Sequence, residues 1–199
     1  YEDKLGTFLV RLSSKDLSPK DSHDVSQLLH AIGDFERIGD HAVNILRVAN
    51  EIHDKDIQFS DKAQEELQVI TRAIITILNL TVEAFEENDP VIAAKVEPLE
   101  QVIDGLKVEL KNRHIRRLQE GRCTIELGFV LTDLLTNYER VSDHCSNIAV
   151  TVIQIKDSSL DTHGYLNEVK NTGNPAFTQA FETYSLEYLL PASPAPEGK

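Results

Sequence analysis

The chain has 199 residues, 41% of them hydrophobic and 27% charged, with 20 Lys and Arg against 33 Asp and Glu and a net charge of −13. This composition excludes wholesale disorder, and its acidity argues against nucleic acid as a partner because a phosphate backbone would be repelled. The apolar runs are shorter than the roughly 18 residues that cross a bilayer, and two cysteines without a CxxC spacing favour a reducing compartment.

Apolar residues recur every three or four positions along the chain, which predicts helices. In chain order these helices span residues 5–12, 24–53, 60–87, 91–120, 123–156 and 175–189. Ser60 is expected to cap the third helix, Pro98 to kink the fourth and Gly121 to end it. Residues 191–199 are rich in Pro, Ala, Ser and Gly and are expected to fray.

No segment shows the strict alternation of apolar and polar residues that is typical of a strand. The sequence therefore predicts an all-α fold, in which long helices joined by short connections form a bundle. The helix over residues 24–53 is expected to bury one apolar stripe: Leu28, Ile32, Phe35, Gly39, Ala42 and Leu46.

A segment of twelve residues occurs twice, 103 positions apart: residues 34–45 (DFERIGDHAVNI) match residues 137–148 (NYERVSDHCSNI) with six identities. Two helices lie between the copies, so one repeat unit is expected to contain three helices. We expect residues 1–55 to be the remainder of a truncated first three-helix repeat, 56–157 to be the second repeat, and 158–199 to be an extension with a short helix and a disordered tail.

Each copy carries two carboxylates one helical turn apart, Glu36 with Asp40 and Glu139 with Asp143. Such pairs lie on one face of a helix and repel each other, so the sequence predicts a compensating cation. That cation is Arg37 in the first copy and Arg140 in the second, a basic residue of the next helix, or a metal ion.

A third pair, Glu100 and Asp104, lies on the preceding helix and would face Glu139 and Asp143 in an antiparallel arrangement. Four carboxylates from two helices would make an oxygen-rich site for iron, manganese or another divalent ion, with His144 able to supply a nitrogen. Ion pairing with arginine would satisfy the same residues without metal, and Glu97 is an alternative to Glu100.

Other polar residues of the two copies are candidates for a supporting role. His41 and His144 are either metal ligands or surface histidines, and Asn44 and Asn147 are expected to tie neighbouring helices together. Neither a Glu-x-x-His pair of helices nor a glycine-rich phosphate loop, GxSxG or HExxH occurs, so no catalytic residue is predicted. One basic cluster either complements a helix C-terminus or meets an anionic partner surface: Lys111, Arg113, His114, Arg116, Arg117 and Arg122.

The doubled Glu-Arg-x-x-Asp-His pattern resembles PhoU-like proteins, whose tandem three-helix, spectrin-repeat-like bundles carry a repeated carboxylate signature, and the resemblance covers residues 1–156. It implies a cytosolic regulator of phosphate uptake, with multinuclear iron or zinc sites on the carboxylate faces of some members. Together with the spacing argument above, this predicts an iron, zinc, manganese or nickel ion whose ligands would come from six carboxylates: Glu36, Asp40, Glu100, Asp104, Glu139 and Asp143. Because the carboxylate pair expected before Tyr1 is absent, metal is expected at the second bundle. Residues 123–129 and 165–168 look most like the PhoU-like domain at the C-terminus of sodium/phosphate cotransporter proteins, which implies a cytoplasmic domain of a membrane protein.

We therefore hypothesise a binding mechanism. The acidic faces would dock on the membrane domain of a phosphate transporter, in the same full-length chain or another, or on a phosphate-signalling kinase. Association into a homodimer is a further alternative. Two other classes remain as alternatives: a metal-dependent phosphohydrolase that uses the carboxylates, and a structural helical interaction module without metal.

Overall fold

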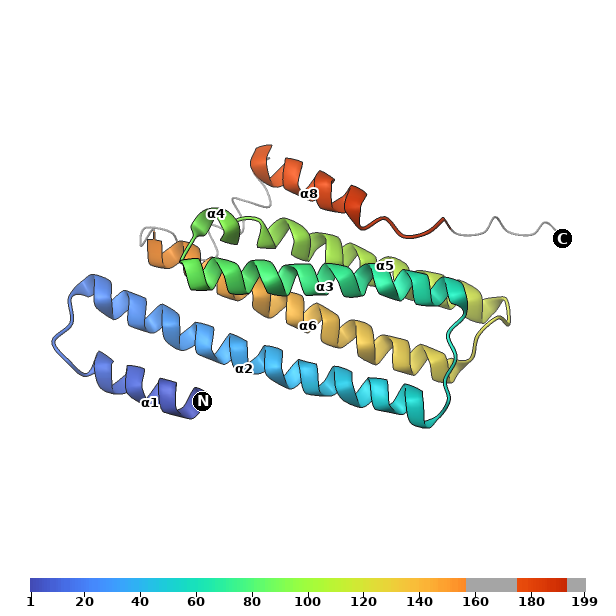
Figure 1. Cartoon of the computed structure of the whole chain (residues 1–199), viewed down its shortest axis with the longest axis horizontal. Coiled ribbons are helices and arrows are strands. Elements are labelled where there is room, and N and C mark those ends of the chain that lie inside the picture. The colour runs from blue at the N-terminus through green and yellow to red at the C-terminus, as the bar shows by residue number, and fades with distance from the viewer. Residues whose placement is uncertain (157–174, 193–199) are drawn as a thin grey trace.

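The computed structural model describes residues 1–156 and 175–192. The described residues form seven helices and no strand, which confirms the all-α helical bundle (Figure 1). The helices are α1 Glu2–Ser13, α2 Pro19–Asp54, α3 Asp61–Glu87, α4 Pro90–Ala93, α5 Val96–Gln119, α6 Ile125–Lys156 and α8 Pro175–Glu187. The predicted resemblance at residues 165–168 and most of the predicted frayed tail lie outside the described residues.

Two helix boundaries lie where the sequence predicts them. The Ser60 hydroxyl accepts a hydrogen bond from the backbone N–H of Ala63 at 3.3 Å and so caps the start of α3. Gly121 has a φ of +67°, the left-handed conformation that glycine adopts easily, and it follows directly after the last turn of α5.

Two other boundaries differ from the prediction. The helix expected from residue 24 begins at Pro19, because Ser18 caps it and proline at the first helical position needs no N–H partner. The kink expected at Pro98 is instead a break at Ala94 and Lys95, between α4 and α5. Pro98 lies in the first turn of α5, where proline is tolerated.

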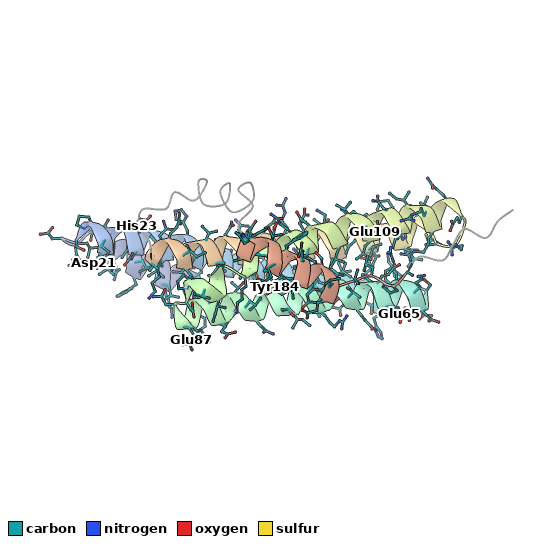
Figure 2. The ribbon with its side chains drawn as sticks, turned by 90° about the horizontal axis from the view of Figure 1, so that it is seen from above. Asp21, His23, Glu65, Glu87, Glu109 and Tyr184 are labelled. Atoms are coloured by element: carbon teal, nitrogen blue, oxygen red, sulfur yellow. The ribbon has the colours of Figure 1, made fainter. Side chains whose placement is uncertain are left out.

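The helices α3, α5 and α6 pack against one another as a three-helix bundle, and α2 lies antiparallel along α6 (Figure 1). On the two outer sides, α1 packs on α2 and α8 on α5. Figure 2 shows the side chains from above, with Glu65 and Glu87 toward opposite ends of α3. The largest fully buried apolar side chains of the three-helix bundle include Ile70, Ile77, Leu99, Ile103, Leu135 and Ile148.

Helix α3 is long and apolar enough to cross a membrane by length and composition. The core helix of a bundle passes the same test. Ile70, Ala73 and Ile77 of α3 are fully buried against the rest of the bundle, and this burial accounts for the apolar character of the helix.

The stripe predicted to be buried on the second helix is exposed over its C-terminal half. Gly39, Ala42 and Leu46 are exposed on α2, whereas their repeat equivalents on α6, such as Cys145 and Ala149, are buried. The two helices differ in exposure because they have different neighbours. Helices α3 and α5 both pack on α6, whereas within the described residues α2 packs mainly on α1 and α6. The side of α2 that does bury apolar residues carries Ala31, Ile38, Ile45 and Val48.

The two cysteines are expected to differ strongly in reactivity. Burial raises the pKa of the Cys145 thiol to about 12, so the reactive thiolate is scarce at pH 8. Burial also raises the pKa of Cys123, but this residue is partly exposed. An aromatic disulfide reagent at pH 8 should titrate one fast thiol in native protein, and that reaction should be lost in Cys123→Ser. Two thiols reacting at the same rate without denaturant would contradict this assignment.

Candidate functional site

The two copies of the repeated segment meet face to face. Asp34 of α2 accepts a hydrogen bond from His144 of α6, at 2.8 Å between Oδ1 and Nδ1. Asn137 of α6 and His41 of α2 make the corresponding bond at 2.9 Å. Asp34 and Asn137 are repeat equivalents, as are the two histidines, so the bonds are related by a local two-fold axis between the antiparallel helices.

The histidines lie side by side at this axis. The ring centroids of His41 and His144 are 5.7 Å apart, with the ring planes 28° from parallel. Asn147 also donates from Nδ2 to Oδ1 of Asp34 at 3.2 Å, across the two helices. Asn44, its repeat equivalent, instead accepts from Arg47 of its own helix. Among the residues that the structure describes, the expected tie to a neighbouring helix is therefore made by Asn147 and not by Asn44.

Basic residues of the chain itself compensate the carboxylates of the second copy. Glu139 pairs with Lys107 of α5, and both side chains are largely buried. Asp143 accepts from Arg140 of its own helix at 3.2 Å between Oδ2 and Nη1. Of the compensating cations that the sequence predicts, the structure contains the arginine of the same helix. The second cation, Lys107, comes from α5, the preceding helix in the chain and not the next one.

The carboxylates of the first copy lie on the exposed side of α2. Glu36 and Asp40 are exposed, and the Arg37 Nε is 3.9 Å from Glu36 Oε2. Solvent screens exposed charges such as these and reduces the cost of their repulsion. This pair is therefore free of the burial that affects Glu139.

Glu100 and Asp104 lie beside the second copy. Helices α5 and α6 run antiparallel, with Glu97 accepting from Ser146 and Lys107 bonding Glu139, so the residues between Glu97 and Lys107 lie level with the second carboxylate pair. Glu100 is buried and Asp104 is half-buried. Glu100 and Asp104 therefore lie beside the second carboxylate pair, as the sequence predicts. The two carboxylates of that pair, however, already have basic partners, which are Lys107 and Arg140.

The donor set does not fit a preformed metal centre. In residues 1–156 and 175–192 no three His, Cys, Asp or Glu side chains are placed to hold one ion. An ion shared by Glu139 and Asp143 would have to replace Lys107 and Arg140 as their partners. Metal binding at these carboxylates stays a prediction.

Metal analysis of the anaerobically purified protein tests that prediction. If the carboxylates are ligands, mass spectrometry should find bound iron, zinc, manganese or nickel, and Glu139→Ala with Asp143→Ala should remove it. Lys107→Gln serves as the matched variant, because releasing Glu139 from its ammonium partner should raise metal occupancy. Equal metal content in all three proteins would contradict binding at this pair.

Sequence reasoning missed three residues of this site: Asp34, Asn137 and Lys107. Asp34 and Asn137 each lie seven positions before a repeated histidine, which is two helical turns and therefore the same face. This spacing, present in both copies, is the signal that points to them. Lys107 carried no such signal, because its pairing depends on the register between α5 and α6.

Removing the Asp34 carboxylate is expected to loosen the pairing of α2 and α6. Asp34→Ala leaves the ring N–H of His144 and the Asn147 amide without their acceptor, so the free energy of unfolding should fall by about 1.5 kcal/mol. Urea unfolding followed by circular dichroism measures the change. The exposed Glu83→Ala on α3 is the control and should have no measurable effect; equal stability of the two variants would count against the interhelical role.

The chain matches the model of a known protein family. The PhoU domain family model matches residues 1–49 and 67–152, more than half of the chain. The matched residues include both copies of the repeated segment. No solved structure matches the chain.

One curated relative matches as well. The chain is 28% identical over 129 residues to the phosphate-specific transport system accessory protein PhoU homolog 1 of Thermotoga maritima. The alignment covers 65% of this chain and 55% of the relative. The chain thus spans about half the length of the curated relative it matches.

Proposed function

Because the chain belongs to the PhoU domain family, we propose that it is a regulatory domain of phosphate transport and not an enzyme. The name of the Thermotoga relative, an accessory protein of phosphate-specific transport, supports this assignment. In the finer form of the proposal, the chain is the cytoplasmic PhoU-like domain of a sodium/phosphate cotransporter protein. It acts by docking on the membrane domain of a phosphate transporter, with a phosphate-signalling kinase as the other candidate partner.

One observation carries the docking proposal: the outer face of α2 is open where the same face of α6 is covered. Val43 is 49% exposed, while its repeat equivalent Ser146 is 8% exposed. Leu46 is 59% exposed, and its equivalent Ala149 is buried. Val43 and Leu46 lie one helical turn apart, so their exposed side chains adjoin and offer an apolar surface that a partner helix can cover.

The helices that cover this face on α6 indicate what kind of partner would cover the equivalent face of α2. On α6 this face is covered by the helices α3 and α5, and Lys107 of α5 bonds Glu139. Glu36 of α2 is the repeat equivalent of Glu139 and is exposed beside the apolar surface. We therefore expect the occupant to be an amphipathic helix of the partner, with its apolar side on Val43 and Leu46 and a Lys or Arg at Glu36.

Phosphate uptake in cells tests the proposal. Cells that lack their own copy of this protein would carry either the wild type or the double variant Val43→Glu with Leu46→Glu. The double variant should lose the dependence of uptake on external phosphate, because two charges on the open face block an apolar contact. Val82→Glu on the exposed side of α3 is the matched control and should behave as wild type. Normal regulation by the double variant would refute docking through α2.

A further inference from the structure

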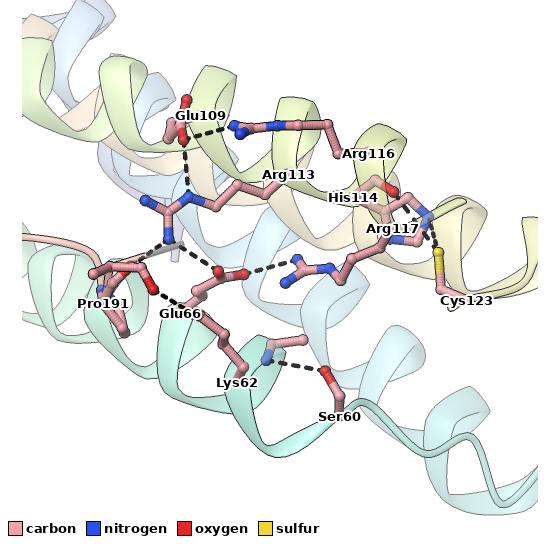
Figure 3. A network of polar contacts seen from close by, with 12 residues as sticks. Ser60, Lys62, Glu66, Glu109, Arg113, His114, Arg116, Arg117, Cys123 and Pro191 are labelled. Atoms are coloured by element: carbon pink, nitrogen blue, oxygen red, sulfur yellow. Dashed lines mark hydrogen bonds and ion pairs between the residues drawn. The ribbon is translucent and has the colours of Figure 1, made fainter. Parts of the chain in front are cut away.

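The basic residues near the end of α5 gather around a cavity of about 220 Å³, beside the start of α3 (Figure 3). Five cations line it: Lys62, Arg113, Arg116, Arg117 and Arg122. Glu66 and Glu120 are the carboxylates in its wall. The cavity is therefore positive in a chain whose net charge is −13.

A buried carboxylate fixes two of these arginines. Glu66 is 1% exposed and accepts from Arg113 Nη1 at 3.0 Å and from Arg117 Nη2 at 2.7 Å. Even with Glu109, which also pairs with Arg113, the three carboxylates do not neutralise the five cations that line the cavity. Arg113 also donates through Nε to Glu109, and that hydrogen bond lowers the pKa of the Glu109 carboxyl. Because the guanidinium groups are held before any ligand arrives, an anion would bind without the cost of ordering them.

Other donors surround the fixed pair. A guanidinium group has five N–H donors, and the bond to Glu66 engages one Nη of Arg117. Arg116 and Arg122 are each about half exposed and form ion pairs with Glu109 and Glu120 at the surface. Ser60 also lines the cavity, at the N-terminus of the 27-residue helix α3, where backbone N–H groups favour negative charge.

Two of the cations are held by neutral acceptors from the C-terminal segment. Arg113 Nη1 donates to the backbone carbonyl of Pro191 at 2.6 Å, and Lys62 Nζ donates to the carbonyl of Ala192. An anionic acceptor adds a Coulomb attraction to the cation that a neutral carbonyl oxygen does not supply. A dianion in the cavity would therefore be preferred over these carbonyls as the partner of Lys62 and Arg113.

We infer that this cavity binds a phosphate group, either free inorganic phosphate or the phosphate of a small phosphomonoester. The planar guanidinium groups match the oxygens of phosphate in pairs, and the excess of cations suits a dianion better than a single carboxylate. Binding would displace residues 191–192 from Lys62 and Arg113. The site lies on α3 and α5, away from the open face of α2, so it stands or falls independently of the docking proposal.

Isothermal titration calorimetry of the full chain tests the site. Inorganic phosphate, glycerol 3-phosphate and acetate would be titrated separately at the same ionic strength, set with sodium chloride. We expect saturable binding of at least one phosphate compound, and its affinity should fall about tenfold or more in Lys62→Gln with Arg122→Gln. Arg47→Gln with Lys95→Gln removes two exposed cations elsewhere and should leave the affinity unchanged.

The two phosphate arms identify the form of the ligand. Binding of inorganic phosphate alone assigns the site to the free ion, and tighter binding of glycerol 3-phosphate assigns it to a phosphomonoester. The absence of saturable binding by both, equal affinity of the two double variants, or equally tight acetate would overturn the proposal. As a second readout, the amide NMR signal of Ala192 should shift with the same midpoint as the heat, and an unchanged signal would overturn the displacement of residues 191–192.

Discussion

Glu66→Ala is expected to lower the free energy of unfolding by about 3 kcal/mol, because it leaves two buried arginines without their shared acceptor. Arg113 and Arg117 are mostly buried, at 12% and 14% side-chain exposure, and the Glu66 carboxylate is the acceptor that they share. Without it, two guanidinium groups of like charge face each other in a poorly solvated space. The loss should appear as a lower urea midpoint by circular dichroism.

The neighbouring residue provides the control for Glu66. Glu65 is the same residue type on the same helix turn, but it is exposed (Figure 2). Glu65→Ala should change stability by less than about 0.5 kcal/mol. If both alanine variants unfold at the same urea concentration, the Glu66 carboxylate does not hold the arginine pair.

Cys145→Asp is expected to cost about 4 kcal/mol of unfolding free energy, because it places a carboxylate in the core of the three-helix bundle. Cys145 is fully buried in the core that α6 shares with α3 and α5. Ala42, its repeat equivalent on α2, is exposed. Ala42→Asp introduces the same charge at the same position of the repeat and should cost only the lower helix propensity of aspartate, about 0.7 kcal/mol.

Thermal and urea unfolding of the two aspartate variants measures the asymmetry of the repeats. A large loss for Cys145→Asp with a small one for Ala42→Asp is the expected result. Similar losses would mean that the face of α2 around Ala42 is covered as well. That outcome would contradict the open face on which the docking proposal rests.

The fold class could be predicted from the sequence because its signals are local. The apolar period of three to four residues, the Ser60 cap and Gly121 each act within one or two helical turns. Apolar periodicity places the start of α2 too late, because the apolar stripe begins later than the helix does. The cap at Ser18 and the proline after it mark the true start.

The functional site could be predicted only in part, because it depends on which helices become neighbours. The repeat identifies His41 and His144 as related positions, but not that their rings stack between antiparallel helices. Periodicity alone predicts that Leu46 is buried. Leu46 is exposed instead, because no long helix of the described residues lies over that side of α2. Periodicity gives the apolar face of a helix and not the partner that covers it.

Docking through α2 is tested most directly by cysteine protection on the open face of this helix. In a Cys123→Ser background, Val43→Cys should react quickly with a maleimide in the isolated protein, as should the control Val82→Cys on α3. When membranes that contain the phosphate transporter are added, position 43 should become protected while position 82 stays reactive. Equal labelling of position 43 with and without these membranes would contradict docking of this domain through α2.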